Sequence, residues 1–134
     1  MKSFFIISFI LLVSSNAFSI TIKVVDHALF GDTSVYLSSS PVLSDITVTK
    51  VFSQGLADYS IQIKRSSCMS ADKRVYITTA NLFSNKSVYF TESPLFADVK
   101  IYVTASTLLA DHVVCADPSV SDIEAIAAFA GIFY

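Results

Sequence analysis

The stretch Glu92–Val114, ESPLFADVKIYVTASTLLADHVV, contains nearly the same short phrase twice. In the first copy, residues 95–98 (LFAD) lead into the apolar segment 101–103. Thirteen residues later, 108–111 (LLAD) lead into 113–115. Recurrence at a fixed interval is the mark of a repeat architecture, and it has to be identified before any other feature of the fold is assigned.

The phrase extends outward from this stretch over most of the chain. An Asp or Asn, here called the anchor, recurs every 13 or 14 residues, and the positions of each unit are counted from it. The seven anchors are Asp32, Asp45, Asp58, Asp72, Asn85, Asp98 and Asp111. The residue before each anchor is small, and position +3 is always β-branched: Val35, Val48, Ile61, Val75, Val88, Ile101 and Val114.

These columns predict one short strand and one tight turn per unit. Position +5 is aliphatic in most units, and apolar residues two apart are typical of a strand with one face on the core. The anchor is expected to hydrogen-bond amides two residues further on, as Asp and Asn do in turns. A large apolar residue two or three positions before each anchor is expected to plug the core from the turn: Phe30, Leu43, Leu56, Met69, Phe83, Phe96 and Leu109.

The two flanks of the repeats differ from the units between them. Residues 20–25 alternate like an N-terminal strand. After Pro118, Ser121 and Glu124 have the spacing of a capping box, and apolar residues then follow at helical intervals. We therefore predict a short helix over about 122–130, docked on the sheet by one face and ended by Gly131.

The first residues have the features of a secretory signal peptide. Lys2 precedes an unbroken apolar run, Phe4–Val13, and small residues at Ala17 and Ser19 suit cleavage before Ile20. We expect 1–19 to be the signal and 20–134 a single exported domain, periplasmic or secreted, with the repeats within 29–117. The alternative is an uncleaved membrane anchor; after cleavage, stable membrane insertion is not expected.

Charge and cysteine content limit the partners. Nine basic residues less Lys2 leave eight against eleven acidic ones, so the mature chain carries a formal charge of −3. Scattered basic residues argue against nucleic acid as a partner. Cys68 and Cys115 in an exported chain favour a disulfide, with two separate buried thiols as the alternative.

The repeated phrase resembles the septoil-knot domain, a family of small bacterial repeat proteins without an established function. The likeness is carried by 71–76 (ADKRVY), 87–91 (SVYFT) and 97–103 (ADVKIYV), and it extends more weakly over 31–117. The resemblance implies an all-β domain of seven short strand-turn repeats, with its backbone tied in a torus knot of seven crossings. It supplies no catalytic residues. If the knot is absent, an unknotted β-solenoid is the alternative.

Four tyrosines share position +4, which alternation directs away from the +3 face: Tyr36, Tyr76, Tyr89 and Tyr102. They are candidates for a stacking platform that binds a cell-envelope glycan or protein. The alternative is that a helix, loop or second layer covers them, or that they pack half-buried across strands.

Other chemistry receives less support from the sequence. Calcium ligation by the anchors would need glycine-rich loops, and the chain has three glycines. His112 and Cys115 give one zinc-type pair without a second pair at ligand spacing, and no nucleophile motif is present. We expect no metal site, no cofactor and no enzyme. Two hypotheses follow: an exported structural or binding protein with a protease-resistant fold, or a glycan- or protein-binding module that uses the tyrosines.

Overall fold

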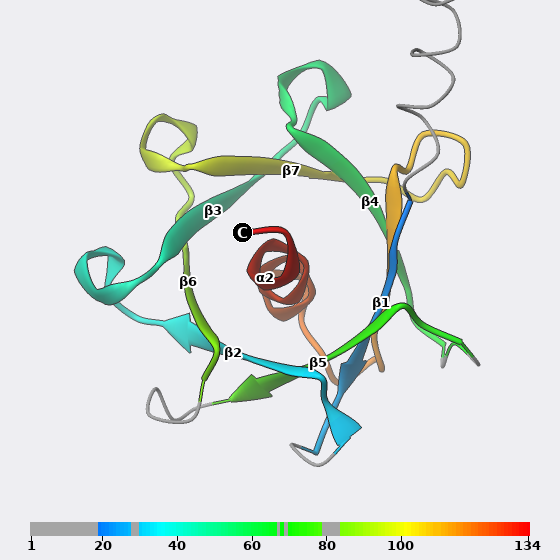
Figure 1. Cartoon of the computed structure of the whole chain (residues 1–134). Helices are drawn as coiled ribbons and strands as arrows, with labels where there is room; N and C mark the ends of the chain where they lie inside the picture. Colours follow the sequence, from blue (N-terminus) through cyan, green and yellow to red (C-terminus); the bar gives the residue numbers. More distant parts are fainter. Residues whose placement is uncertain (1–18, 28–29, 67, 69, 79–83) are drawn as a thin grey trace, which may run out of the picture.

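The computed structural model describes residues 19–134 apart from 28–29, 67, 69 and 79–83. Within that part the chain forms eight strands, three short 3-10 turns and one α-helix (Figure 1). The strands are β1 Thr21–Val25, β2 Thr33–Ser38, β3 Ile46–Val51, β4 Tyr59–Lys64, β5 Lys73–Thr78, β6 Lys86–Phe90, β7 Val99–Val103 and β8 His112–Cys115. The 3-10 turns are η2 Pro41–Leu43, η3 Gln54–Leu56 and η5 Pro94–Phe96, and the helix is α2 Asp122–Phe133.

The strands are all parallel and close into a barrel in the order β1-β5-β2-β6-β3-β7-β4-β8. The chain therefore winds round the barrel twice. Strands β1 to β4 occupy every second position on the first lap, and β5 to β8 fill the positions between them on the second. The predicted all-β repeat fold is confirmed, with β1 as an eighth strand before the seven units; the solenoid alternative is wrong, because the sheet closes.

The strands are strongly staggered. We call the line along which two neighbouring strands pair a seam. At seven seams, position +3 of one strand pairs with position +1 of the next. On β1, counted from Ser19, position +3 is Ile22, and it pairs with Lys73 of β5. At the eighth, Val114 of β8 pairs with Ile22 of β1 without offset. Seven seams at two residues each give a total stagger of 14 residues, against about 8 in the eight-stranded TIM barrel. Since stagger, tilt and diameter are linked, this barrel is wider for the same number of strands.

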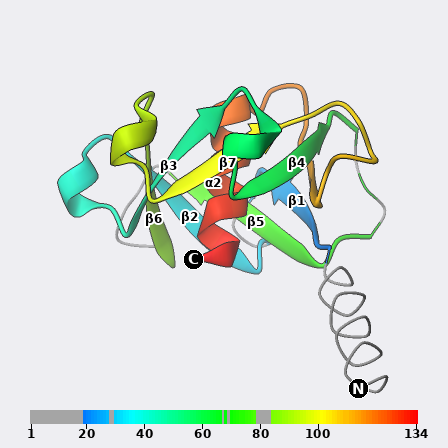
Figure 2. The same cartoon turned by 90° about the horizontal axis from the view of Figure 1, so that it is seen from above.

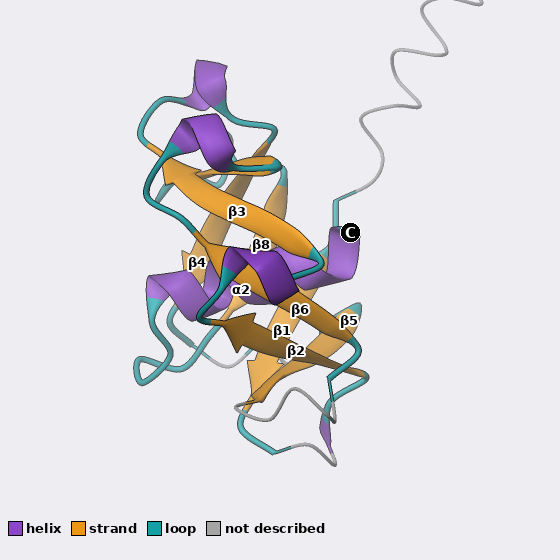
Figure 3. Ribbon diagram, turned by 90° about the vertical axis from the view of Figure 1, so that its left-hand side faces the viewer, coloured by secondary structure: helices purple, strands orange, loops and turns teal. Residues whose placement is uncertain are grey.

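The extra width is filled by a helix. Figures 1 and 2 show α2 inside the ring of strands, and Figure 3 shows it running through the barrel from the side. Residues Ala125 to Gly131 are buried on every side of the helix. Most of them are small, because a helix with full-sized side chains is roughly 10–12 Å across and would crowd the strands. The +3 residues of all seven units are 0 % exposed and complete the core around it.

The structure of the helix corrects two predictions and confirms a third. The expectation of one apolar face docked on the sheet is wrong, since residues on all sides of the helix are enclosed, from Ala125 to Gly131. Gly131 does not end the helix, which continues to Phe133. An added Cβ at Gly131 would lie 2.5 Å from Cγ2 of Val35, so glycine permits contact with β2. The capping box is confirmed: the Ser121 and Glu124 side chains each accept from the other's amide.

The connections carry their large apolar residues outward. The residues expected to plug the core from the turns are exposed instead wherever the structure describes them: Phe30 by 64 %, Leu43 by 72 %, Leu56 by 66 %, Phe96 by 76 % and Leu109 by 45 %. Met69 and Phe83 lie outside the described residues. The prediction is wrong because α2 already occupies the interior, which leaves the connections to cross on the outside of the strands (Figure 1).

Candidate functional site

Each anchor is bound by two hydrogen bonds to one residue of a neighbouring strand. The Asp98 amide donates to the Thr47 carbonyl oxygen at 2.8 Å, and Asp98 Oδ2 accepts from the Thr47 amide at 2.9 Å. The same reciprocal pair joins Asp72 to Thr21, Asp32 to Arg74, Asn85 to Ser34, Asp45 to Ser87, Asp58 to Lys100 and Asp111 to Ser60.

This reciprocal pair of hydrogen bonds, here called a clamp, shows that the predicted role of the anchors is wrong. They do not bond amides two residues further on; their partners lie 42 or 51 residues away on the other lap. Each clamp lies at one of the seven staggered seams, so the anchors fix the register of the barrel. Within the described ranges, no group of three or more His, Cys, Asp or Glu side chains could hold a metal ion.

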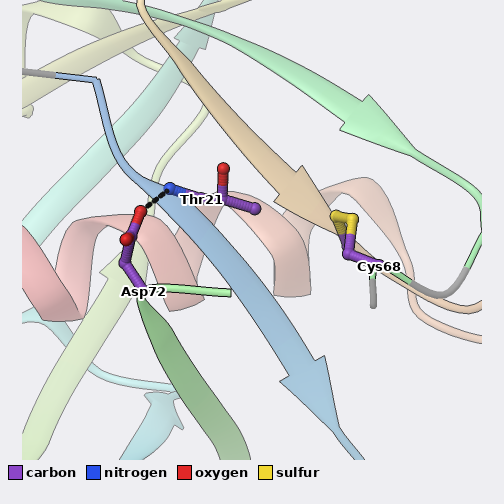
Figure 4. Close-up of a disulfide and its surroundings, with 4 residues drawn as sticks. Thr21, Cys68 and Asp72 are labelled. Atoms are coloured by element: carbon purple, nitrogen blue, oxygen red, sulfur yellow. Dashed lines mark hydrogen bonds between the residues drawn. A yellow bond between two sulfur atoms is a disulfide. The ribbon is translucent and has the colours of Figure 1, made fainter. Parts of the chain in front are cut away.

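The eighth seam, β8–β1, is secured differently. Position −13 from Asp32 is Ser19, and no anchor stands there. Instead, the connection from β4 to β5 crosses over β8 and β1, and a disulfide joins its Cys68 to Cys115 of β8 with a Cα–Cα distance of 6.0 Å. Figure 4 shows this disulfide beside the clamp between Asp72 and Thr21. The predicted disulfide is confirmed. It fixes to β8 the connection between β4 and β5 (residues 65–72), here called the strap, which joins the first lap of the chain to the second.

An aromatic cluster closes the end of the barrel where the strands begin. His112 is 5 % exposed, and its ring lies against Tyr59, Phe129 and Phe133 with centroid distances of 5.8, 5.2 and 4.7 Å. Its Nδ1 accepts a hydrogen bond from the Ile20 amide at 3.0 Å, which ties the start of β1 to β8. Burial lowers the pKa of His112, against the opposing effect of the Asp111 carboxylate, so the ring is held neutral and able to accept.

The four tyrosines at +4 stand on β2, β5, β6 and β7 and are half-buried. The backbone of Gly31, in the connection that crosses β5, is so close to Tyr76 that an added Cβ would lie 3.1 Å from Tyr76 Cβ. On β4, Gln62 takes the same position, and its Nε2 donates to Ala105 of the crossing connection at 3.3 Å. At Tyr76 the contact with Gly31 favours packing beneath the crossing connection; for the other three tyrosines the stacking platform stays a prediction.

A groove of about 1050 Å³ lies where the strap, the β1–β2 connection and the segment after β8 meet. Its walls include Lys23, Arg74, Asp26, Phe30 and Tyr76. Of the four predicted tyrosines only Tyr76 is among the lining residues. The sequence analysis did not predict that the other lining residues form a groove, because a pattern along one strand does not show which strand lies beside it.

On the opposite side of the same groove, Arg65 holds the segment that leads into α2. Its guanidinium donates to the carbonyl oxygens of Asp117 and Val120 and to the Asp122 carboxylate. This network positions the N-terminus of α2 at the end of the barrel opposite His112.

No helix in the part of the chain that the structure describes is long and apolar enough to cross a membrane. No curated protein matches the sequence significantly. A family model described as the 7(1) septoil knot domain matches residues 35–119, which is more than half of the chain. The two-lap winding and the repeated clamps agree with that description. The chain belongs to the 7(1) septoil knot domain family.

Proposed function

We propose that this protein is an exported structural or binding domain whose body resists unfolding and proteolysis. The observation that carries the proposal is the reciprocal clamp at seven seams of a closed barrel. Closure leaves no free sheet edge from which a strand could peel away. Each clamp also joins the first lap to the second, so one strand cannot leave without opening seams on both its sides.

The core adds a second obstacle to unfolding. The helix is enclosed by strands from both laps, and the strap that joins the laps is tied to β8 by the disulfide. Contacts between residues 42 or 51 positions apart slow folding, because a long loop has to close before each of them forms. Those that are not yet formed in the transition state raise the barrier to unfolding. Such a barrier gives kinetic stability, the property that protects proteins exposed to proteases.

Protease resistance is tested by incubating the purified mature chain with subtilisin and thermolysin under native conditions. We expect the domain to survive for hours at concentrations that digest an ordinary domain of this size in minutes. A matched variant, Cys68→Ser with Cys115→Ser, should be digested faster from the strap. Rapid digestion of the native chain at its strands would contradict the proposal.

Export is tested separately. The predicted signal lies outside the described residues, and the disulfide suits an oxidising compartment. We propose a periplasmic or secreted location. N-terminal sequencing of protein recovered from periplasm and medium should begin at Ile20. Recovery of the intact N-terminus from the membrane fraction would support the uncleaved anchor instead.

A second candidate function is binding of a cell-envelope glycan. The observation that favours it is the groove beside Tyr76, which is open, lined more by polar than by apolar groups, and large enough for more than one sugar ring. We expect no catalysis, cofactor or nucleic acid there. Pull-down from the envelope with the native chain tests this function; retention of no glycan would contradict it.

A further inference from the structure

Two cationic side chains lie directly opposite one another on the wall of the groove. Lys23 of β1 and Arg74 of β5 are register partners, and each occupies an outward position next to one fully buried residue, Ile22 and Val75 respectively. Like charges placed opposite each other on neighbouring strands destabilise a sheet. Neither side chain makes a hydrogen bond or ion pair with another described residue. An anion bound between the two side chains would offset this repulsion.

The remaining charges of the groove are already engaged, apart from one. Arg65 is taken up by Asp122 and by two carbonyl oxygens, and the Glu124 carboxylate accepts the capping bond from Ser121. The Asp32 carboxylate accepts from the amide of Arg74, and the Asp117 carboxylate accepts from the amide of Ser119. Asp26 is exposed and makes no bond to a described residue. The charged side chains of the groove that bond to no described residue are therefore two cations and one carboxylate.

Two aromatic side chains of the groove, Phe30 and Tyr76, indicate the chemical class of the ligand. Phe30 stands at the groove and is 64 % exposed, so its ring offers a face for stacking. Tyr76 lies one outward position beyond Arg74, beside Val25. A sugar ring presents C–H groups to an aromatic face and hydroxyls that a carboxylate such as Asp26 can accept from.

We propose that the groove binds an acidic saccharide, with the sugar carboxylate between Lys23 and Arg74 and a ring against Phe30. The inference rests on the glycan-binding candidate above and names the class of ligand and the residues that recognise it. Arg is suited to the carboxylate because its guanidinium can donate two parallel hydrogen bonds, while Lys adds a point charge.

The test is a titration of the mature chain with galacturonic acid oligomers and, separately, with uncharged galactose oligomers of equal length. Binding is monitored by calorimetry and by NMR. We expect saturable binding of the acidic oligomer and binding of the neutral oligomer weaker by about tenfold or more. Inorganic phosphate serves as a bare anion. Equal binding of phosphate and the acidic oligomer would overturn the saccharide assignment, as would the absence of saturable binding at millimolar concentration.

Three variants locate the site. Lys23→Gln with Arg74→Gln should weaken binding of the acidic oligomer by about tenfold or more, and Phe30→Ala should weaken both oligomers. Lys100→Gln is the matched control, because Lys100 is clamped by Asp58 as Arg74 is by Asp32 but lies away from the groove, and it should leave binding unchanged. Unchanged binding by the double variant would overturn the site.

The same variants separate failure of this inference from failure of glycan binding. If the native chain and both groove variants retain an envelope glycan equally in the pull-down, the glycan-binding function stands and the groove assignment falls. If no form of the chain retains any glycan, both fall. Melting curves recorded in parallel establish that each variant is folded at the assay temperature.

Discussion

Asp98 and Thr47 are joined by two hydrogen bonds, one in each direction, although 51 residues separate them in the sequence. The Thr47 amide donates to the carboxylate, and the Thr47 carbonyl oxygen accepts from the Asp98 amide. The same relationship recurs at seven seams. It explains why an Asp or Asn recurs every 13 or 14 residues: the anchor sets the two-residue stagger that makes the barrel wide enough for a helix.

The clamp predicts different effects for two substitutions at one anchor. Asp98→Ala removes the acceptor of the Thr47 amide, and we expect the free energy of unfolding to fall by about 1–3 kcal/mol, the range for hydrogen bonds to charged groups. Asp98→Asn keeps an acceptor oxygen, as Asn85 does naturally, and should cost less. Guanidinium unfolding of the two variants measures the difference. Equal losses would show that the charge, rather than the acceptor, stabilises the seam.

The enclosed helix predicts that Gly131 does not tolerate a methyl group. In Gly131→Ala the added Cβ would lie 2.5 Å from Cγ2 of Val35, so either α2 or β2 must shift. Overpacking of this kind typically costs about 1–3 kcal/mol, which exceeds the gain in helix propensity. Equilibrium unfolding is the measurement.

Gly55→Ala is the control for this prediction, because the only atom near its added Cβ is Ser53 Oγ at 3.9 Å. It should change stability little. Combining Gly131→Ala with Val35→Ala should recover part of the loss from overpacking, although it also removes buried methyl groups. A Gly131→Ala variant as stable as the native chain would show that the helix is not held tightly within the strands.

Removal of the disulfide should destabilise the domain without changing its topology. Cys68 and Cys115 are 47 residues apart, and in the chain-entropy model a crosslink over such a loop contributes roughly 4 kcal/mol. Cys68→Ser with Cys115→Ser should therefore unfold at lower denaturant while retaining its far-ultraviolet circular dichroism. Loss of that spectrum in the absence of denaturant would mean that the seven clamps cannot hold the barrel closed.

Burial of His112 predicts a dependence of stability on pH. The folded-state pKa is lowered from 6.5, so between the folded and unfolded values the unfolded chain binds more protons. The contribution of neutral His112 is complete above about pH 6.5 and is lost as pH falls through the folded pKa. Protonation would also remove the acceptor of the Ile20 amide.

Melting temperatures at pH 7.5 and 5.0 measure this effect. We expect the native chain to lose stability over that interval, and His112→Phe to lose less of it. An identical pH dependence in His112→Phe and the native chain would contradict the proposed role of the ring.

The repeat itself made the strands predictable. Period two at positions +3 and +5 locates every strand from β2 to β8, because local alternation reflects burial of one face. The disulfide and the capping box were also predictable, since compartment and short spacing determine them. These features depend on residues near one another in the sequence or on composition alone.

Features that depend on spatial neighbours were not predictable. The segment after Ser121 is rich in Ala. Small residues fit a helix enclosed by strands, but they also occur in a helix that lies on a sheet, so the sequence does not separate the two arrangements. The partner of each anchor lies on another lap, and identical units make every register look equally suitable. For the same reason the sequence does not show that Lys23 and Arg74 lie opposite each other, because their pairing depends on the register of β1 and β5.

The unfolding rate of the mature chain in guanidinium, extrapolated to water, measures the kinetic stability of the barrel. If the interleaved laps and seven clamps give kinetic stability, the rate should lie at or below the slow end of small domains, on the order of 10⁻⁶ s⁻¹. The disulfide-free variant should still unfold slowly, because the clamps and the winding remain. Unfolding within seconds, with the disulfide intact, would contradict the account.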